Sequence, residues 1–349
     1  MLSISDPVVA VPAKNEEALL PRFIGALARQ TVLASLPEPL KLVIVLNNTD
    51  DGSAAAALKA AEGHPRLRLS LVEVDYPADR AHVGSARRQA MELAAAAAPH
   101  GVILTTDADA APTDGWIEAN LRAIVAGADL VGGLIVGDPE EEAGLGVGFL
   151  RRAHLHFRHA ALCDELAWLI DPIDHDPWPR HRDHTGGSLA VRSAVYRSVG
   201  GIDPLPFRED LAFVSKVRAA GFRLRHPLDV VVSVSARTKG RAVGGMAECL
   251  SAWLQEEAKG SPVLFESPVA VERRLRLRRA IRSLDCLAPY NAASPDGAAR
   301  QRDGALAAPA LIERFAPDDP DAAATVPALA AIAALEARIQ TLRGLSDAA

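Results

Sequence analysis

The chain has 349 residues, of which 49% are hydrophobic and 23% charged, as expected for a soluble globular protein of one large or two ordinary domains. Its formal charge of -6 and the absence of a basic face in the first 260 residues argue against nucleic acid as a partner. Three widely separated cysteines, no signal-type N-terminus and no run of about 20 apolar residues predict a cytoplasmic protein without membrane spans or a disulfide framework.

The first half of the chain alternates short β-rich runs with helical patterns, which is typical of a mainly parallel sheet flanked by helices. Strands are expected at 8–11, 42–46, 67–74, 102–105 and 130–136. Helices are expected between them at about 16–30, 53–62, 84–98 and 114–126. Open α/β folds bind their ligands at the carboxyl ends of the strands. Residues that directly follow these strands are therefore the first candidates for a site.

The second half begins with a polar, turn-rich break at 137–144, and a helix is predicted at about 149–170. A loop dense in Asp, His, Pro and Trp then covers 171–184, and loops of this length often line sites. A strand at 188–191, a helix at 209–220 and a strand at 230–234 come next. The Ala-rich sequence beyond about residue 244 predicts a helical C-terminal extension.

Two carboxylates one residue apart, Asp107 and Asp109, follow the apolar strand at 102–105. Residues i and i+2 of an extended backbone point to the same side, so both carboxylates should face one spot. Hard cations such as Mg²⁺ take oxygen ligands, commonly one or two carboxylates plus substrate phosphates. The same spacing recurs at 174–176 and 319–321, but in Pro-rich loop sequence that favours solvated turn acids. Only the first pair therefore predicts a metal site for a nucleotide-linked substrate.

Polar residues also follow the first two strands. Asn15 and Glu16 come after the first strand, where they either start a helix or face a ligand. Asn47, Asn48 and Asp51 come after the second, where they either form a turn and cap or recognise a base. An Asn or Asp oxygen can accept the imide N–H of uracil, and an Asn amide can donate to a base carbonyl.

Further charged residues stand at the starts of two later helices. Arg87, in the helix at 84–98, either contacts base or phosphate or is an ordinary surface arginine. Glu209 and Asp210 open the helix at 209–220. There the two acids either favour the helix dipole or supply a general base for an acceptor hydroxyl.

In their order, these short motifs resemble those of a family 2 glycosyltransferase of the GT-A fold, which transfers a sugar from a nucleoside diphosphate donor, usually with inversion. The resemblance is carried by segments 12–16, 47–52, 84–87, 107–109, 186–192, 200–203, 209–210 and 219–222. They are spread over about 10–235, so the resemblance extends over two-thirds of the chain. The resemblance implies a Rossmann-like α/β GT-A domain at 1–243, with a donor half at 1–136 and an acceptor and catalytic half at 149–243. A helical extension at 244–349 would follow it.

The resemblance also implies a role for each matching residue. Asp109 and Asp107 would hold Mg²⁺ or Mn²⁺ on the diphosphate, and Asp107 would face the ribose and donor sugar. Asp210 would be the base, with Glu209 beside it. The residues implied around the donor are Pro12, Asn15, Glu16, Asn47, Asn48, Asp51, Arg87, Asp107, Ala108 and Asp109.

Two departures from the family pattern concern the donor site. Many members have Asp where Asn47 and Asn48 stand, which leaves both UDP- and GDP-linked donors open, because a carboxylate suits the two adjacent donors of guanine better than an amide does. Many GT-A enzymes also supply a late His to the metal. This chain has Arg237 and Arg241 near that position, where they either neutralise the diphosphate or are surface charges.

The acceptor is expected to enter near the loop at 171–184, and it could be a saccharide, a lipid-linked molecule or a small molecule. Trp178 either stacks on a sugar face or packs structurally. His184 either contacts the acceptor or diphosphate or is a structurally satisfied histidine, and Gly187 lies in the glycine motif nearby. The basic run from Arg273 to Arg282 is expected to be a solvated helix face, with peripheral contact to anionic lipid as the alternative.

We therefore expect a cytoplasmic, metal-dependent glycosyltransferase of the hexosyltransferase type (EC 2.4). It would combine metal-assisted departure of the leaving group with general-base catalysis. One alternative is a phosphatase with Asp107 as nucleophile, although such enzymes normally carry this motif on their first strand. The other is a catalytically silent protein that binds a sugar nucleotide.

Overall fold

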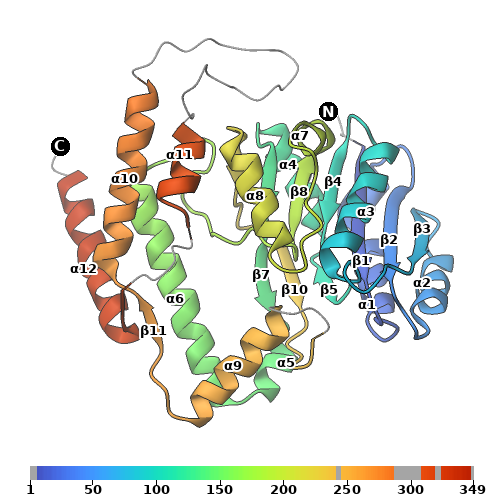
Figure 1. Ribbon diagram of the computed structural model, residues 1–349, viewed down its shortest axis with the longest axis horizontal. Coiled ribbons are helices and arrows are strands. Elements are labelled where there is room, and N and C mark those ends of the chain that lie inside the picture. The colour runs from blue at the N-terminus through green and yellow to red at the C-terminus, as the bar shows by residue number, and fades with distance from the viewer. Residues whose placement is uncertain (1–5, 241–244, 287–307, 319–323, 347–349) are drawn as a thin grey trace.

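The computed structural model describes residues 6–240, 245–286, 308–318 and 324–346. At its centre is a seven-stranded sheet in the order β3-β2-β1-β4-β8-β6-β9 (Figure 1). Its strands are β1 (Pro7–Ala13), β2 (Leu40–Asn47), β3 (Leu67–Val74), β4 (Val102–Thr105), β6 (Leu130–Gly132), β8 (Leu189–Arg192) and β9 (Leu224–Arg225). Neighbours in this sheet pair in parallel except at β8, which is antiparallel to β4 and β6. The predicted α/β class with a mainly parallel sheet is confirmed.

Helices cover both faces of this sheet. One face packs against α1 (Leu20–Ala28), α2 (Ser53–Glu62) and α4 (Trp116–Val125), and the other against α3 (Val83–Ala97), α7 (Ser193–Ser198) and α8 (Glu209–Ala219). Along β1, Val9 and Val11 pack on the first face, whereas Val8 and Ala10 pack on the second. Because both faces are buried, the strands read in the sequence as continuous apolar runs. A short 3-10 helix, η1 (Thr31–Ala34), follows α1.

A second, three-stranded sheet has the order β5-β10-β7 and is formed by β5 (Ala110–Pro112), β10 (Val231–Val234) and β7 (Leu134–Gly137). The expectation of one strand at 130–136 is wrong, because that segment is divided between β6 in the large sheet and β7 in the small one. The division falls at Gly133, where an added Cβ would lie 2.1 Å from Ser188 Oγ. Only glycine allows so close an approach, which lets the chain pass from one sheet to the other.

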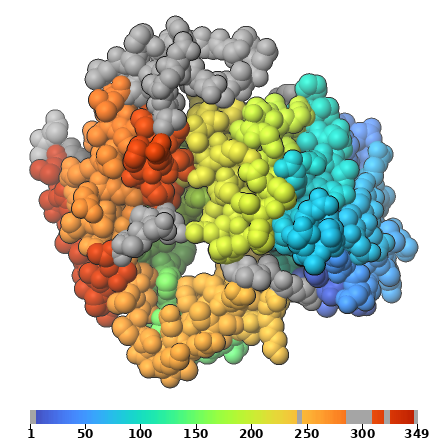
Figure 2. Space-filling view, in the orientation of Figure 1, coloured from blue at the N-terminus to red at the C-terminus, as the bar shows by residue number. Residues whose placement is uncertain are grey.

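The C-terminal helices form a layer beside α6 (Val147–Ile170). In this layer Leu166 of α6 shares a core with Val271 and Leu275 of α10 (Pro268–Cys286) and with Leu335 of α12 (Ala328–Ser346). Figure 1 shows these three helices side by side at the left, away from the large sheet. In Figure 2 the same C-terminal segments, orange and red, form that side of the molecule. The predicted helical extension therefore shares its core with α6.

The remaining elements connect this layer to the rest of the chain. They are α5 (Pro139–Gly144), α9 (Met246–Ala258), α11 (Ala308–Phe315) and the antiparallel pair of β11 (Leu264–Glu266) and β12 (Thr325–Pro327). The break expected at 137–144 thus contains the short helix α5. The Asp138 side chain caps this helix by accepting hydrogen bonds from the backbone N–H groups of Glu140 and Glu141. None of the described helices is long and apolar enough to cross a membrane.

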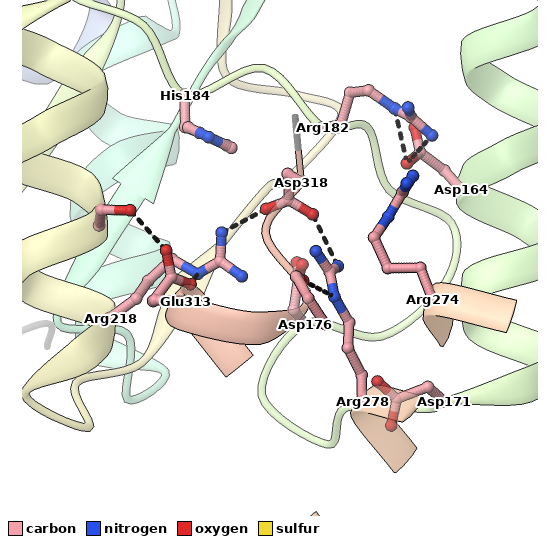
Figure 3. A network of polar contacts seen from close by, with 12 residues as sticks. Asp164, Asp171, Asp176, Arg182, His184, Arg218, Arg274, Arg278, Glu313 and Asp318 are labelled. Carbon is pink, nitrogen blue, oxygen red and sulfur yellow. Dashed lines mark hydrogen bonds and ion pairs between the residues drawn. The ribbon is translucent and has the colours of Figure 1, made fainter. Parts of the chain in front are cut away.

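Ion pairs connect the C-terminal layer to α8 (Figure 3). Arg218 of α8 pairs with Glu313 of α11, with 2.9 Å between Nε and Oε1. Arg218 also pairs with Asp318, whose other carboxylate oxygen accepts a hydrogen bond from Arg278 Nη1 at 2.6 Å. The helix that opens with Glu209 and Asp210 is therefore anchored to α10 and α11.

The basic run from Arg273 to Arg282 lies on α10 and largely contacts the protein itself. Arg274 pairs with Glu266, and Arg282 pairs with Asp171 at the end of α6. For these arginines the expected solvated helix face is wrong, because packing against α6 and β11 brings carboxylates within reach of their guanidinium groups. Contact of the run with anionic lipid stays a prediction.

Candidate active site

A cavity of about 480 Å³ opens at the carboxyl ends of β1, β2 and β4. The first turns of α8 and α9 complete its wall. The predicted site residues that line it are Pro12, Glu16, Asn47, Arg87, Asp107, Ala108, Asp109, Gly187, Glu209, Asp210 and Arg237. Residues from the predicted donor half and from the predicted catalytic half thus meet around one space.

The acid pair lies on the turn between β4 and β5. The Thr106 hydroxyl donates a hydrogen bond of 2.6 Å to the carbonyl of Gly187, which holds this turn against the loop before β8. The Asp107 side chain is 39% exposed, compared with 20% for Asp109. Burial and then the charge of Asp107 raise the pKa of Asp109 to about 6, although Arg237 acts in the opposite direction. The turn therefore concentrates negative charge at the predicted place.

Arg87 is buried beside the acid pair, with 3% of its side chain exposed. Its Nη2 donates to Asp107 Oδ1 at 2.7 Å, and its Nε donates to Glu209 Oε1 at 3.0 Å. Nη1 donates to the Thr105 hydroxyl and to the Gly186 carbonyl at 3.2 and 3.0 Å. Although burial opposes it, the charges of Asp107 and Glu209 raise the pKa of Arg87. Because protein groups occupy these donors, Arg87 positions two acids rather than presenting a free guanidinium to a nucleotide.

Arg237 follows β10 and contacts two acids that line the cavity. Its Nη1 donates to Glu16 Oε2 at 2.9 Å, and its Nη2 lies 2.7 Å from Glu16 Oε1 and 2.8 Å from Asp109 Oδ2. Of the two expectations for this arginine, the surface charge is wrong, because the side chain lies in the cavity between the ends of β1 and β4. Arg241 lies outside the described residues.

Asn47 is the only asparagine of the predicted donor set that lines the cavity within the described chain. It is 3% exposed, its amide donates to the His82 carbonyl at 3.2 Å, and its Oδ1 has no hydrogen-bond partner in the structure. A buried carbonyl oxygen without a donor carries a desolvation cost that a ligand N–H can offset. Oδ1 is itself buried, so a base N–H that reached it from the cavity would supply its missing hydrogen bond.

The other predicted nucleotide contacts hold the loops behind the cavity. Asn15 Nδ2 donates to Asp50 Oδ1 at 2.6 Å, and Asn15 Oδ1 accepts from the Asp50 backbone N–H at 3.0 Å. Asn48 exchanges hydrogen bonds of 2.9 and 3.1 Å with the Tyr76 backbone. Asp51 accepts from the Ser53 backbone N–H at the start of α2, at 3.0 Å. Asp51 thus matches the turn-and-cap alternative, whereas the helix start expected at Asn15 and Glu16 is wrong, because α1 begins at Leu20.

The two acids at the start of α8 have different surroundings. Glu209 is 5% exposed and engaged by Arg87. Asp210 is partly exposed, and its carboxylate accepts hydrogen bonds from the backbone N–H groups of Gly186 and Leu211, at 2.5 and 2.7 Å. Asp210 is thus oriented by backbone groups while it lines the cavity.

The loop at 171–184 lies apart from this cavity, which neither Trp178 nor His184 lines. His184 Nδ1 is 3.1 Å from His226 Nε2, and His226 Nδ1 is 2.8 Å from Asp176 Oδ2. Burial, followed by the nearby His226, lowers the pKa of His184 to about 3. Figure 3 shows His184 facing Asp318, on the side of the C-terminal layer. His184 is therefore placed as a structural histidine.

The expectation of solvated acids at 174–176 is wrong for Asp176. Its side chain is 4% exposed and pairs with Arg180 at 2.9 Å as well as with His226. Although burial acts to raise it, these partners lower the pKa of Asp176 to about 2. The third triplet, at 319–321, lies outside the described residues.

Sequence reasoning missed the ion pair between Glu16 and Arg237 and the apolar part of the cavity. Phe207 and Met246, each 50% exposed, line that part together with Cys249, which is a free thiol. Neither spacing nor strand position signals these residues. They meet only because α9 folds back towards the start of α8.

Within the described ranges, no cluster of three or more His, Cys, Asp and Glu side chains could hold a metal ion. Asp107 and Asp109 each use one carboxylate oxygen in an ion pair with an arginine, so Asp107 Oδ2 and Asp109 Oδ1 stand outside these pairs. Mg²⁺ and similar ions are commonly held by one or two carboxylates together with substrate phosphates and water. The residues present fit a metal that enters with a phosphorylated ligand rather than one held by the protein alone.

An α/β protein with acids and amides around a cavity at its strand ends has the construction of a nucleotide-binding enzyme. Residues 8–159 match the family model described as "Glycosyl transferase family 2". This segment contains Glu16, Asn47 and the acid pair, so the expected resemblance to a family 2 glycosyltransferase is confirmed there. Asp210 and Arg237 lie beyond the matched segment. No curated protein matches the sequence.

Among solved structures, the chain is similar to mannosyltransferase PcManGT from Pyrobaculum calidifontis in complex with GDP-Man and Mn²⁺. The identity is 19%, the match covers 99% of this chain and 80% of that one, and the TM-score is 0.45. TarS 1-349 from S. aureus has 14% identity over 79% of this chain and 72% of its own, with a TM-score of 0.47. Glucosyl-3-phosphoglycerate synthase from Mycobacterium tuberculosis, in complex with phosphoglyceric acid, has 17% identity over 74% and 81%, with a TM-score of 0.40. At these identities and TM-scores, the resemblance to glycosyltransferases rests on the sequence match of residues 8–159.

Proposed function

We propose that this glycosyltransferase moves a sugar from a UDP- or GDP-linked donor to an acceptor hydroxyl, with inversion at the anomeric carbon. The observation that supports this best is the cavity shared by Asn47, Asp107, Asp109 and Asp210. It provides an acceptor for a base N–H, two carboxylates for a metal-bound diphosphate and one further carboxylate for an incoming hydroxyl.

On the donor side, we assign recognition of the base to Asn47, whose buried Oδ1 lacks a partner. Asp107 and Asp109 would hold Mg²⁺ or Mn²⁺ together with the diphosphate, and the bound metal would offset the charge that develops on the leaving group. Arg87 keeps Asp107 in place from the buried side. In this proposal 1–136 is the donor half of the molecule.

On the acceptor side, we assign the general base to Asp210. Its carboxylate takes the proton of the acceptor hydroxyl as that oxygen attacks the anomeric carbon, and the bond from this carbon to the diphosphate oxygen breaks. The backbone N–H groups of Gly186 and Leu211 keep the carboxylate oriented. Phe207 and Met246 offer apolar contact to an acceptor at the same end of the cavity. Segment 149–243 would thus be the acceptor and catalytic half, and 244–349 an extension that supports it.

A thermal-shift panel of UDP-, GDP- and dTDP-sugars, with and without Mn²⁺, tests this function directly. A ligand that binds the folded state alone raises the melting temperature, by a free energy of about 2.7 kcal/mol at 100 times its Kd. We expect one nucleotide class to stabilise the protein, and Asp109→Asn to reduce that shift in Mn²⁺. Asp114→Asn is the matched control, because Asp114 is 58% exposed and does not line the cavity. If no sugar nucleotide raised the melting temperature in any condition, the proposal would be wrong.

The two alternatives predict different results in the same protein. A phosphatase with Asp107 as nucleophile would hydrolyse phosphate esters and lose that activity in Asp107→Asn, with no response to sugar nucleotides. A catalytically silent binder would show the thermal shift, but it would neither hydrolyse nor transfer the sugar. Sugar-nucleotide hydrolysis, measured as released UDP or GDP, separates these outcomes.

A further inference from the structure

We propose that Arg237 is an internal counter-cation of the donor site. In the absence of donor its guanidinium neutralises Asp109 and Glu16, and with a metal-bound donor in place it transfers to the diphosphate. The inference rests on the proposed function, because it assumes that Asp109 takes part in binding a metal and diphosphate. In this proposal Arg237 weakens the binding of free metal to the protein, and it binds the donor directly.

The contacts of Arg237 are those of a guanidinium held between two carboxylates. Its two terminal nitrogens contact both oxygens of Glu16 at 2.7 and 2.9 Å, and Nη2 also contacts Asp109 Oδ2 at 2.8 Å. Glu16 follows β1, Asp109 follows β4 and Arg237 follows β10, so three separate elements meet at this one group. Such a fork-shaped contact fits carboxylate and phosphate oxygens equally well.

The two arginines of the site differ in what a ligand can do to them. Arg87 is 3% exposed and also donates to Thr105 and to the Gly186 carbonyl, so moving it would leave buried groups unpaired. Arg237 is 25% exposed, lines the cavity and contacts Asp109 with a terminal nitrogen. An arginine of this kind can exchange one anionic partner for another without opening the protein interior.

The position of Arg237 implies competition with the metal. A divalent cation and the guanidinium both require Asp109, so without a diphosphate the metal must displace a cation that is already paired. With a diphosphate present, the guanidinium gains phosphate oxygens as new partners while the metal takes the carboxylate. Removing the positive charge should therefore strengthen binding of free metal and weaken binding of the nucleotide, two changes of opposite sign.

The test compares wild type with Arg237→Met, which keeps an unbranched stem and removes the charge. Mn²⁺ affinity without nucleotide is measured by electron paramagnetic resonance. UDP and GDP affinities are measured by titration calorimetry in saturating Mn²⁺, with EDTA as the metal-free reference. Arg237 competes with Mn²⁺ for Asp109 and contacts the nucleotide, each through one charge-assisted contact. Its loss therefore predicts at least about tenfold tighter Mn²⁺ binding and at least about tenfold weaker binding of the preferred nucleotide. Arg22→Met is the matched control, since Arg22 also pairs with a carboxylate, that of Asp138 at 2.6 Å, but does not line the cavity. The control should change neither affinity.

The outcomes separate the inference from the proposed function. If wild type binds UDP or GDP and Arg237→Met changes neither affinity, or weakens both together, the counter-cation role is wrong and the proposed function stands. If wild type binds neither nucleotide in EDTA or Mn²⁺, the proposed function fails. Should Arg237→Met not fold, Arg237→Lys serves instead, because it keeps the charge but loses the fork to Glu16. Lysine should then give smaller changes of the same signs, and unchanged values would overturn the inference.

Discussion

Arg87 and Glu209 form a buried ion pair, with Nε 3.0 Å from Oε1, between residues 122 positions apart in the sequence. The pair joins α3 to the first turn of α8, and the residue after Glu209 is Asp210. Since the same guanidinium contacts Asp107 at 2.7 Å, one buried cation fixes both the acid pair and the start of the helix that carries the proposed base. A single side chain thus aligns the proposed donor side with the proposed acceptor side.

Arg87→Met should strongly destabilise the fold, because it leaves Glu209 as a buried, unpaired carboxylate. Breaking a buried pair from one side typically costs about 3–5 kcal/mol. Arg122→Met is the control, since the Arg122 pair with Asp229 is more than half exposed on both sides and should contribute no more than about 1 kcal/mol. Urea unfolding of both variants measures the difference. Equal midpoints would mean that the buried network contributes little to stability.

The double variant Arg87→Met with Glu209→Gln should recover part of this loss, because no unpaired charge then remains. A coupling energy of about 0.5–3 kcal/mol between the two changes is expected for residues in direct contact. Strict additivity of the two single variants would contradict the pairing.

Gly84→Ala should destabilise the protein and lower its activity. An added Cβ would lie 2.0 Å from the Leu205 carbonyl oxygen, so α3 or the loop before α8 must move. We expect a loss of about 1–3 kcal/mol, the usual range for overpacking. Gly63→Ala is the matched control, because nothing lies within 4 Å of its added Cβ. A similar change in melting temperature for both variants would show that the approach of α3 to this loop is not tight.

The central sheet could be predicted from sequence because its strands are buried on both faces and therefore appear as apolar runs. The strands at 67–74 and 102–105 have the predicted bounds, and the acid pair follows its strand as expected. Periodicity could not reveal that 130–136 is shared between two sheets, since the passage depends on a close approach of Gly133 to Ser188.

The site was harder to predict than the fold. A strand end places a residue near the edge of a sheet, but it does not decide whether the side chain faces the ligand or holds its own loop. Asn47 lines the cavity, whereas its neighbour Asn48 binds the Tyr76 backbone. The ion pair of Arg237 with Glu16 joins residues 221 positions apart, and no local pattern encodes such a contact.

The stability of the protein should fall as the pH drops from about 6.5, because His181 and His184 are held neutral in the folded state. Burial, followed by the nearby His226, lowers the pKa of each to about 3. An unfolded histidine has a pKa of about 6.5, so between these values the unfolded chain binds protons that the folded chain does not. Each group then makes the free energy of unfolding smaller by up to about 1.4 kcal/mol per unit of falling pH.

Urea midpoints at pH 7, 6 and 5 would check this dependence. His184→Gln should reduce the slope of unfolding free energy against pH, whereas the exposed His100→Gln should leave it unchanged. If the two variants gave the slope of wild type, the neutral histidine pair would not account for the acid sensitivity.

Asp210→Asn and Glu209→Gln should separate catalysis from support at the start of α8. Asp210 accepts one backbone N–H on each carboxylate oxygen, so Asp210→Asn keeps only one of these hydrogen bonds. Because the side chain is partly exposed, the variant should still fold and bind donor while kcat falls about 10²–10⁴-fold. Glu209→Gln removes the charge that pairs with Arg87, so it should lower the melting temperature and reduce kcat less than Asp210→Asn does.

Asp203→Asn is the control, because Asp203 is 48% exposed and does not line the cavity. Measuring kcat, donor affinity and melting temperature for all three decides the assignment. If Glu209→Gln were stable but inactive while Asp210→Asn stayed active, Glu209 would be the base. Arg87 would then have to release Glu209 during the reaction.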